Sequence, residues 1–230
     1  MREIEVSRLT EVIEKLCIEA NEHLPEDVKD AIKTCRACED GEIAKGVLDN
    51  IIENFDIADS ENVPICQDTG MAVFFVEIGQ DVHFEGQWLE DAINEGVRQG
   101  YTEGYLRKSV VADPILRENT KDNTPAIIHY SIVPGDKVTI TFAPKGFGSE
   151  NMSRVFMLKP ADGIEGVKNA ILTAVKDAGP NACPPMVVGV GIGGTFEKCA
   201  ILAKKALTRP VGEHSAIPYV KELEEEMLEK

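Results

Sequence analysis

The amino-acid sequence predicts an α+β fold in a single domain, with a helical N-terminal portion and a mixed β-sheet flanked by helices. Two patterns along the chain indicate this class. Apolar residues recur at three- and four-residue steps in the first part of the chain, whereas β-rich runs begin at residue 71. No repeat or linker divides the 230 residues, which are enough for one large domain with a buried core.

The N-terminal helices are expected over about residues 1–58. Pro25, followed by acidic residues, marks the start of a second helix. A third apolar set extends from Ile43 to Phe55. The first helix is indicated by a stripe of apolar positions: Ile4, Leu9, Val12, Ile13 and Leu16.

The sheet-containing part is expected over about residues 59–212, followed by a helix that begins near residue 217 and is incomplete at Lys230. "MAVFFVEIG" (71–79) and "MVVGVGIGG" (186–194) predict buried strands, and residues 88–108 and 162–178 predict helices. Thr195 is expected to cap a further helix that follows it. Two β-rich runs are joined by "PGD" (134–136), which predicts a hairpin.

The charge of the chain bears on its partners and location. The 24 basic and 40 acidic side chains give a net charge of −16, which argues against a nucleic-acid or anionic-membrane surface. No apolar run approaches the roughly 20 residues that span a bilayer, and the N-terminus resembles no signal or transit peptide. A cytoplasmic protein is therefore expected.

Six cysteines raise the question of redox or metal chemistry. A disulfide framework is not expected in a cytoplasmic chain of this size. Cys35 and Cys38 form a CxxC inside a helical stretch, without the second pair that a zinc site needs. The two are interpreted as thiols on a helix face, with a redox pair as the alternative, and Cys17 and Cys199 are assigned to the core.

Cys66 and Cys183 stand apart because each lies in a proline-containing loop just before an apolar run, in "NVPICQDTG" and "GPNACPPM". A buried structural thiol usually lies inside such a run. Iron–sulfur clusters are held by cysteine thiolates, often with proline nearby. The spacing leaves two interpretations open: ligands of one iron–sulfur site, or two structural thiols.

Two glycine-containing loops have the composition of anion sites. "FAPKGFGSENMSR" (142–154) places Lys145, two glycines and several polar residues after a β-rich run, where amides and an ammonium can meet a carboxylate. "GVGIGGTFEK" (189–198) fits neither a dinucleotide fingerprint nor a P-loop. It is interpreted as a tight turn with close packing, with anion contact as the weaker alternative.

Three of these motifs together, "ICQDTG", "KGFGSEN" and "NACPPMVVGVGIGGTFEKCAILAKKAL", resemble the alpha-type catalytic domain of class I fumarate hydratase and L-tartrate dehydratase. The resemblance covers about residues 60–212 and implies an oxygen-sensitive hydro-lyase with a 4Fe-4S cluster. In that family three cysteines hold the cluster and its fourth iron acts as a Lewis acid. The expected reaction is reversible hydration of fumarate to (S)-malate, as in the tricarboxylic acid cycle.

The resemblance also implies roles for individual residues. Cys66 and Cys183 are expected as cluster ligands, and Gln67 and Asp68 as catalytic residues beside the cluster. The substrate-binding residues are expected to be Arg107, whose guanidinium suits a carboxylate, Gly148, through its backbone amide, and Lys145.

The family pattern places the third cluster cysteine beyond Lys230, and Cys199 matches no ligand position. This chain alone is therefore expected to be inactive and to carry no intact cluster. The expected partners are a fumarate hydratase beta subunit and a small dicarboxylate substrate, in a homodimer or heterotetramer. Two alternatives remain open: an L-tartrate dehydratase alpha subunit yielding oxaloacetate, and a non-catalytic anion-binding or assembly module.

Overall fold

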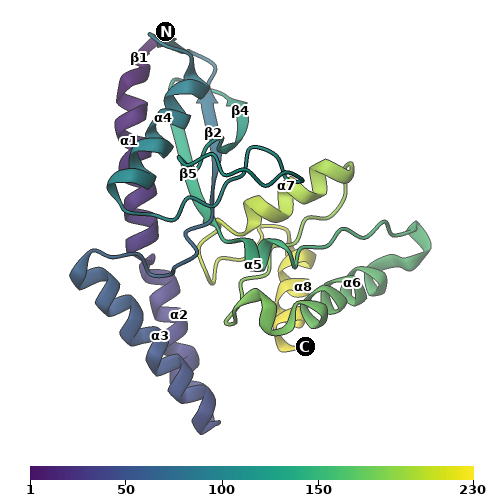
Figure 1. Cartoon of the computed structure of the whole chain (residues 1–230). Coiled ribbons are helices and arrows are strands. Elements are labelled where there is room, and N and C mark those ends of the chain that lie inside the picture. The colour runs from purple at the N-terminus through teal and green to yellow at the C-terminus, as the bar shows by residue number, and fades with distance from the viewer. The chain divides into compact units, whose positions relative to one another are not determined.

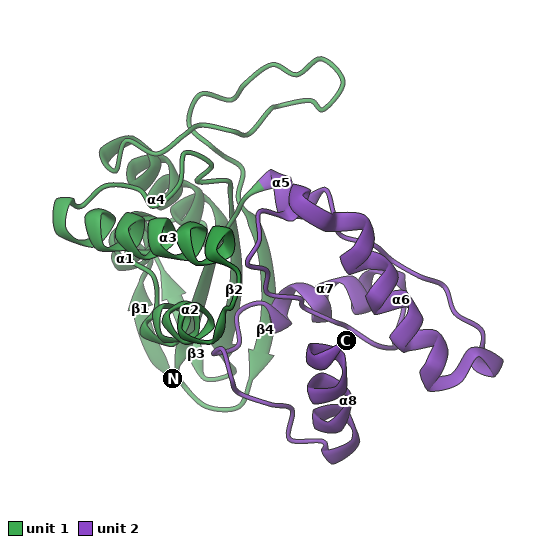
Figure 2. Ribbon diagram, turned by 90° about the horizontal axis from the view of Figure 1, so that it is seen from below, with its two compact units in different colours: residues 1–146 green, residues 147–230 purple.

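The computed structural model describes residues 1–230 and confirms the α+β class. Its contacts divide the chain into two compact units, Met1–Gly146 and Phe147–Lys230, which Figure 2 colours separately. All strands belong to unit 1. No helix is both long and apolar enough to cross a membrane.

Unit 1 begins with the predicted helical portion. A short strand, β1 (Arg2–Glu5), leads into α1 (Val6–Glu22), α2 (Glu26–Cys38) and α3 (Glu42–Glu61). Helices α2 and α3 pack against each other (Figure 1). Ion pairs join them, among them a two-bond contact from Arg36 to Asp49, at 2.6 and 3.0 Å, and one between Lys29 and Asp59.

The main sheet of unit 1 has three strands in the order β4-β2-β5 (Figure 1). They are β2 (Met71–Gly79), β4 (Ile127–Val133), which is parallel to β2, and β5 (Val138–Lys145), which is antiparallel to it. A second, two-stranded sheet pairs β1 with β3 (Val82–Glu85).

The predicted hairpin across residues 134–136 is wrong. Strands β4 and β5 lie on opposite sides of β2, and their connection passes the end of β2, where Gly79 N–H donates to Lys137 O at 2.7 Å. Residues 72–76 of β2 are buried along their whole length, on both faces. A strand without a polar face fits best at the centre of a sheet, so β2 separates the two runs that adjoin in sequence.

The core of unit 1 lies between β2 and two helices, α1 and α4 (Leu89–Glu103). These helices run side by side (Figure 1), because glycines spaced four residues apart on α4 face α1. A Cβ atom at Gly96 would lie 2.6 Å from Ile13 Cβ, and one at Gly100 would lie 2.7 Å from Cys17 Cβ. Cys17 is fully buried, which confirms its assignment to the core. Burial also raises the pKa of its thiol to about 12.

Unit 2 is built from helices and extended segments. Its helices are α5 (Phe147–Glu150), η1 (Pro160–Asp162), α6 (Gly163–Ala178), η2 (Gly179–Ala182), α7 (Phe196–Ala206) and α8 (Pro218–Glu229). Helix α6 packs against α8, and Lys168 pairs with Glu226 at 2.8 Å. Thr195 stands at the start of α7, but its hydroxyl donates to the Glu197 carboxylate rather than capping the backbone.

The predicted strand over residues 186–194 is also wrong. This apolar segment has no strand partner and instead lies along α7. A Cβ atom at Gly189 would lie 2.2 Å from Ala203 O, and one at Gly191 would lie 2.0 Å from Cys199 O. The glycines therefore permit direct backbone approach to the helix, and this agrees with the close packing expected of the loop.

The glycine contact between α1 and α4 gives a stability prediction. Gly96→Ala should destabilise the protein, because the added methyl group collides with Ile13 and the Thr10 carbonyl. Such overpacking costs about 1–3 kcal/mol, whereas the gain in helix propensity is at most about 1 kcal/mol. Urea denaturation measures the free energy of unfolding of the variant and of the wild-type protein.

Gly46→Ala in the exposed α3 is the matched control. No atom lies within 4 Å of a Cβ there, so the same change should stabilise by about 0.5–1 kcal/mol. A Gly96→Ala variant as stable as Gly46→Ala would contradict close helix packing.

Candidate functional site

The turn before β2 carries three of the predicted site residues. Cys66 is exposed, and Asp68 N–H donates to its Sγ at 3.4 Å. The Asp68 carboxylate in turn accepts the Gly70 N–H through Oδ1 at 3.2 Å. Gly70 has φ +63°, and a Cβ atom there would lie 2.2 Å from Lys145 O. Glycine therefore lets this turn press directly against the end of β5.

Arg107 is brought to the same turn from a separate loop. Its Nη1 donates to Gln67 Oε1 at 2.9 Å, so the structure joins two residues that lie 40 positions apart. Its backbone N–H also donates to Thr69 Oγ1 at 3.0 Å. The predicted helix over residues 88–108 ends earlier, at Glu103, and Gly104 is its C-cap residue. Arg107 therefore lies on a loop anchored by the buried Leu106.

The buried Tyr101 holds the turn of residues 66–70 by a hydrogen bond. The Tyr101 hydroxyl donates to Thr69 O at 2.9 Å, and its ring is fully buried. Burial raises the pKa of Tyr101 well above its usual value. The phenol therefore stays protonated at neutral pH and keeps this hydrogen bond.

Lys145 and Asp68 lie at the same end of the sheet. Lys145 is the last residue of β5 and pairs with Met71, the first residue of β2. Its ammonium donates to Gly146 O at 3.2 Å. A Cβ atom at Gly146 would lie 3.2 Å from Asp68 Oδ2, so the carboxylate sits against this glycine.

Unit 2 holds the other two predicted residues. Gly148 in α5 lies beside η2, where its Cβ would be 3.4 Å from Asn181 O. Cys183 follows η2 directly, with φ +57° and an exposed thiol. Lys204 of α7 binds both carboxylate oxygens of Glu150, at 2.6 and 2.5 Å, and so fixes α5.

The seven predicted residues thus form two groups. One group gathers in unit 1 and consists of Cys66, Gln67, Asp68, Arg107 and Lys145. The other lies in unit 2, where Gly148 is next to Asn181, two residues before Cys183. The six cysteines are free thiols. Cys35 and Cys38 are exposed on α2, and Cys199 is half-buried and donates to Phe196 O at 3.2 Å.

The thiols of Cys66 and Cys183 suit iron in chemical type and in exposure, and the Asp68 N–H bond to sulfur is typical of cluster ligands. No group of three histidine, cysteine or acidic side chains gathers as a metal site. Two of the residues present, Cys66 and Cys183, fit an iron–sulfur ligand set by type and exposure.

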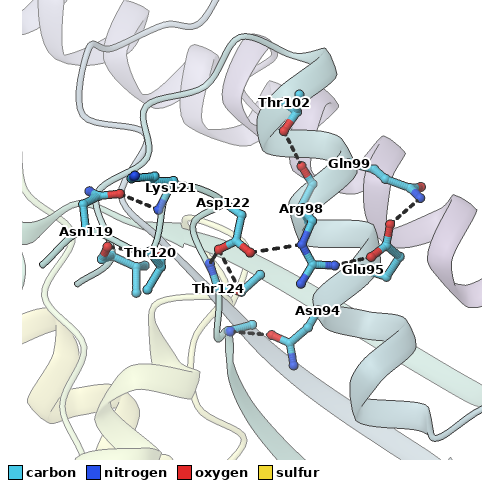
Figure 3. Close-up of polar contacts among 12 residues, drawn as sticks. Asn94, Glu95, Arg98, Gln99, Thr102, Asn119, Thr120, Lys121, Asp122 and Thr124 are labelled. Carbon is cyan, nitrogen blue, oxygen red and sulfur yellow. Dashed lines mark hydrogen bonds and ion pairs between the residues drawn. The ribbon is translucent and has the colours of Figure 1, made fainter. Parts of the chain in front are cut away.

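The sequence interpretation missed a polar network behind the site. Arg98 of α4 donates to Asp122 at 3.0 Å and also pairs with Glu95 (Figure 3). The other oxygen of Asp122 accepts the Thr124 hydroxyl and N–H, at 2.8 and 3.0 Å. Asn123, between them, is fully buried. The signal was available in "KDNTPA", a polar stretch placed before a strand just as "CQDTG" is.

Comparison with known proteins matches residues 10–230 to the family described as Fumarate hydratase (Fumerase). The chain belongs to the fumarate hydratase family. It is 44% identical over 229 residues to the "Putative L(+)-tartrate dehydratase subunit alpha" of Methanocaldococcus jannaschii, covering 97% of this chain and 80% of the relative. It is 32% identical over 223 residues to the "L(+)-tartrate dehydratase subunit alpha" of Escherichia coli (strain UTI89 / UPEC), covering 95% and 73%.

The comparisons confirm the resemblance found in the sequence. This member of the fumarate hydratase family is of the alpha-subunit type shared with tartrate dehydratases, a family of hydro-lyases. The chain spans about four fifths of the archaeal relative and about three quarters of the bacterial one.

The network behind the site gives a pH prediction. Burial pushes the pKa of Asp122 up, but the Thr124 hydrogen bonds and the Arg98 guanidinium together hold it below its usual value. Asp122 therefore stabilises the fold above pH 4, and this contribution is lost as pH falls through its folded pKa. Asp122→Asn should lower the free energy of unfolding at pH 6, and by less at pH 3.

Urea denaturation at the two pH values tests this, with the exposed Asp40→Asn as the control. The control should cost little at either pH. A cost of Asp122→Asn that stays constant from pH 6 to pH 3 would refute the role of the charged carboxylate.

Proposed function

We propose that this chain is the alpha subunit of an iron–sulfur hydro-lyase that adds water reversibly to fumarate, giving (S)-malate. The observation that carries the proposal is the joint placement of Gln67, Asp68 and Arg107, linked by the 2.9 Å bond from Arg107 to Gln67. The family described as Fumarate hydratase supports the reaction class. L-Tartrate is the second candidate substrate, because the relatives at 44% and 32% identity are named L(+)-tartrate dehydratase subunits.

The chemistry of the chain's own groups follows from their types. Arg107 is exposed beside Gln67, where a planar guanidinium can bind a substrate carboxylate with two parallel hydrogen bonds. Asp68, fixed by the Gly70 N–H, is assigned to proton transfer at the carbon next to a carboxylate. The Lys145 ammonium and the Gly148 amide are assigned to the remaining substrate oxygens.

The cofactor proposed is a 4Fe-4S cluster with Cys66 and Cys183 as two of its ligands. When bound, it supplies a Lewis acid that makes hydroxide a better leaving group. A third thiolate from outside residues 1–230, which the family resemblance implies, would complete the set. Residues 1–230 alone are therefore proposed to be inactive.

The partner proposed is a beta subunit. The relatives' names identify them as alpha subunits, which supports a second subunit. The exposure of large apolar side chains in unit 2 supports it as well, because such surface is costly to leave in water. They include Val187, Val188, Ile192 and Phe196.

The proposal is tested on the purified complex of this chain with its beta subunit, after anaerobic reconstitution with iron and sulfide. Cys66→Ser and Cys183→Ser should each lower the bound iron and abolish turnover. Cys199→Ser, whose thiol contacts only its own helix backbone among the bonds described, is the control and should keep both. Retained turnover in Cys66→Ser and Cys183→Ser would point to chemistry that does not use the cluster, whereas no turnover by the wild-type complex would favour the non-catalytic anion-binding or assembly module.

The same complex distinguishes the substrates, with fumarate, (S)-malate and L-tartrate assayed in parallel. Turnover of L-tartrate to oxaloacetate alone would replace fumarate with the second candidate. A stoichiometric four-iron cluster on residues 1–230 without a partner would refute the incomplete ligand set.

Arg107 offers a sharper test of substrate binding. Arg107→Lys should lower kcat/KM roughly 10- to 100-fold, since a lysine cannot form the paired bonds of a guanidinium and charged hydrogen bonds contribute about 1.5–3 kcal/mol. Steady-state kinetics measure this. Arg117→Lys, in the same exposed loop region, should leave kcat/KM unchanged. Equal effects of the two substitutions would remove Arg107 from the site.

A further inference from the structure

We propose that Asn123 is a positioning residue that holds the turn carrying Asp68 and the loop carrying Arg107 in fixed relation to each other. The inference rests on the proposed function, which makes those two side chains the working groups. It assigns to Asn123 no contact with substrate.

Asn123 joins the two segments through both ends of its amide. Its Oδ1 accepts the backbone N–H of Ser109 at 2.7 Å and of Val110 at 3.1 Å. Its Nδ2 donates to Gly70 O at 3.0 Å. The side chain is fully buried, so these bonds are shielded from competing water.

Asn123 contacts Gly70, two residues after Asp68, and Ser109, two residues after Arg107. Gly70 also donates its N–H to the Asp68 carboxylate, so a shift of Gly70 moves that carboxylate directly. Ser109 follows Arg107 at the same spacing. The loop of residues 104–126 contains only one isolated bridge, between Val111 and Asn119, and no helix or strand. Its position near the turn therefore depends on side-chain bonds such as those of Asn123.

Asn123 is itself firmly placed. The neighbouring Asp122 is bound by Arg98 of α4 and accepts the Thr124 N–H at 3.0 Å (Figure 3). Asn123 has φ +62°, a left-handed conformation that asparagine tolerates better than most residues. The network on α4 thus fixes the backbone from which the Asn123 amide reaches the turn.

The role requires an acceptor and a donor on one short side chain, and few residues offer both. Aspartate keeps the acceptor for Ser109 and Val110 but places an oxygen against Gly70 O. Alanine loses all three bonds and leaves buried backbone groups without partners, which is costly. Asn123→Ala and Asn123→Asp therefore separate the two halves of the contact.

Asn94→Ala is the matched control. Asn94 holds the same segment to α4 by accepting the Ala126 N–H, and its amide donates to Glu90 O within the helix, but it contacts neither Gly70 nor Ser109. A purely structural role predicts that Asn94→Ala and Asn123→Ala both lower the urea midpoint while the folded enzyme keeps its kcat and KM.

The first experiment measures steady-state kinetics of the reconstituted complex well below each variant's unfolding midpoint. Asn123→Ala and Asn123→Asp should lower kcat/KM roughly 100-fold, the size of effect expected from a small misplacement of reacting groups. Asn94→Ala should change it less than threefold. Asn123 variants with unchanged kcat and KM would overturn the proposal.

The second experiment needs no activity, and it separates this proposal from the proposed function. Amide hydrogen exchange of the chain should accelerate at Gly70 in both Asn123 variants, whereas Ser109 and Val110 should accelerate only in Asn123→Ala. Unchanged exchange at Gly70 overturns the positioning role. If the wild-type complex turned over none of the substrates, the proposed function would fail, and exchange at Gly70 would still decide whether Asn123 fixes the turn.

Discussion

The burial of β2 on both faces is the constraint on which unit 1 depends. Its residues 72–76 have no polar face, so the strand takes the centre of the sheet with β4 and β5 on either side. The helices α1 and α4 cover one face at the close distance that their glycine contact permits. Strand β2 begins at Met71, just after the turn that carries Gln67 and Asp68. It therefore gives a fixed base to these polar residues, which lie outside any helix or strand.

Polar side chains hold the loops of the site where the backbone alone would not. A loop lacking helix or strand must satisfy its N–H and C=O groups in another way once it is buried. The Thr69 hydroxyl accepts the backbone N–H of Arg107. The Tyr101 hydroxyl donates to the Thr69 carbonyl, and the Asn123 amide donates to the Gly70 carbonyl. These buried neutral groups lie next to the exposed Arg107 and the half-buried Asp68. A buried hydrogen-bonded layer of this kind orders charged side chains without requiring that they be buried themselves.

Unit 2 differs in how much apolar surface it buries. Unit 1 has a continuous buried core, whereas Ala178 and Leu223 are the buried hydrophobic residues of unit 2. Its stability therefore draws on ion pairs, such as Lys204 with Glu150, and on backbone approach at Gly189 and Gly191. The segment of residues 186–194 is apolar along its length but half exposed at several positions. Hydrophobic composition alone made it a strand in the sequence interpretation, although a strand needs a paired neighbour.

The sequence by itself determined the α+β class, the helices of the N-terminal portion, β2 and the identity of the candidate residues, because periodicity and motif are local properties. Tertiary structure decided what local signals cannot: that β2 separates β4 from β5, that α4 ends before Arg107, and that Arg107 meets Gln67. Asn123 shows the reason most clearly. Its neighbours in the fold, Gly70 and Ser109, are 53 and 14 residues away in sequence, and no spacing rule connects them. Their contact arises only when the buried strand and its covering helices set the two loops side by side.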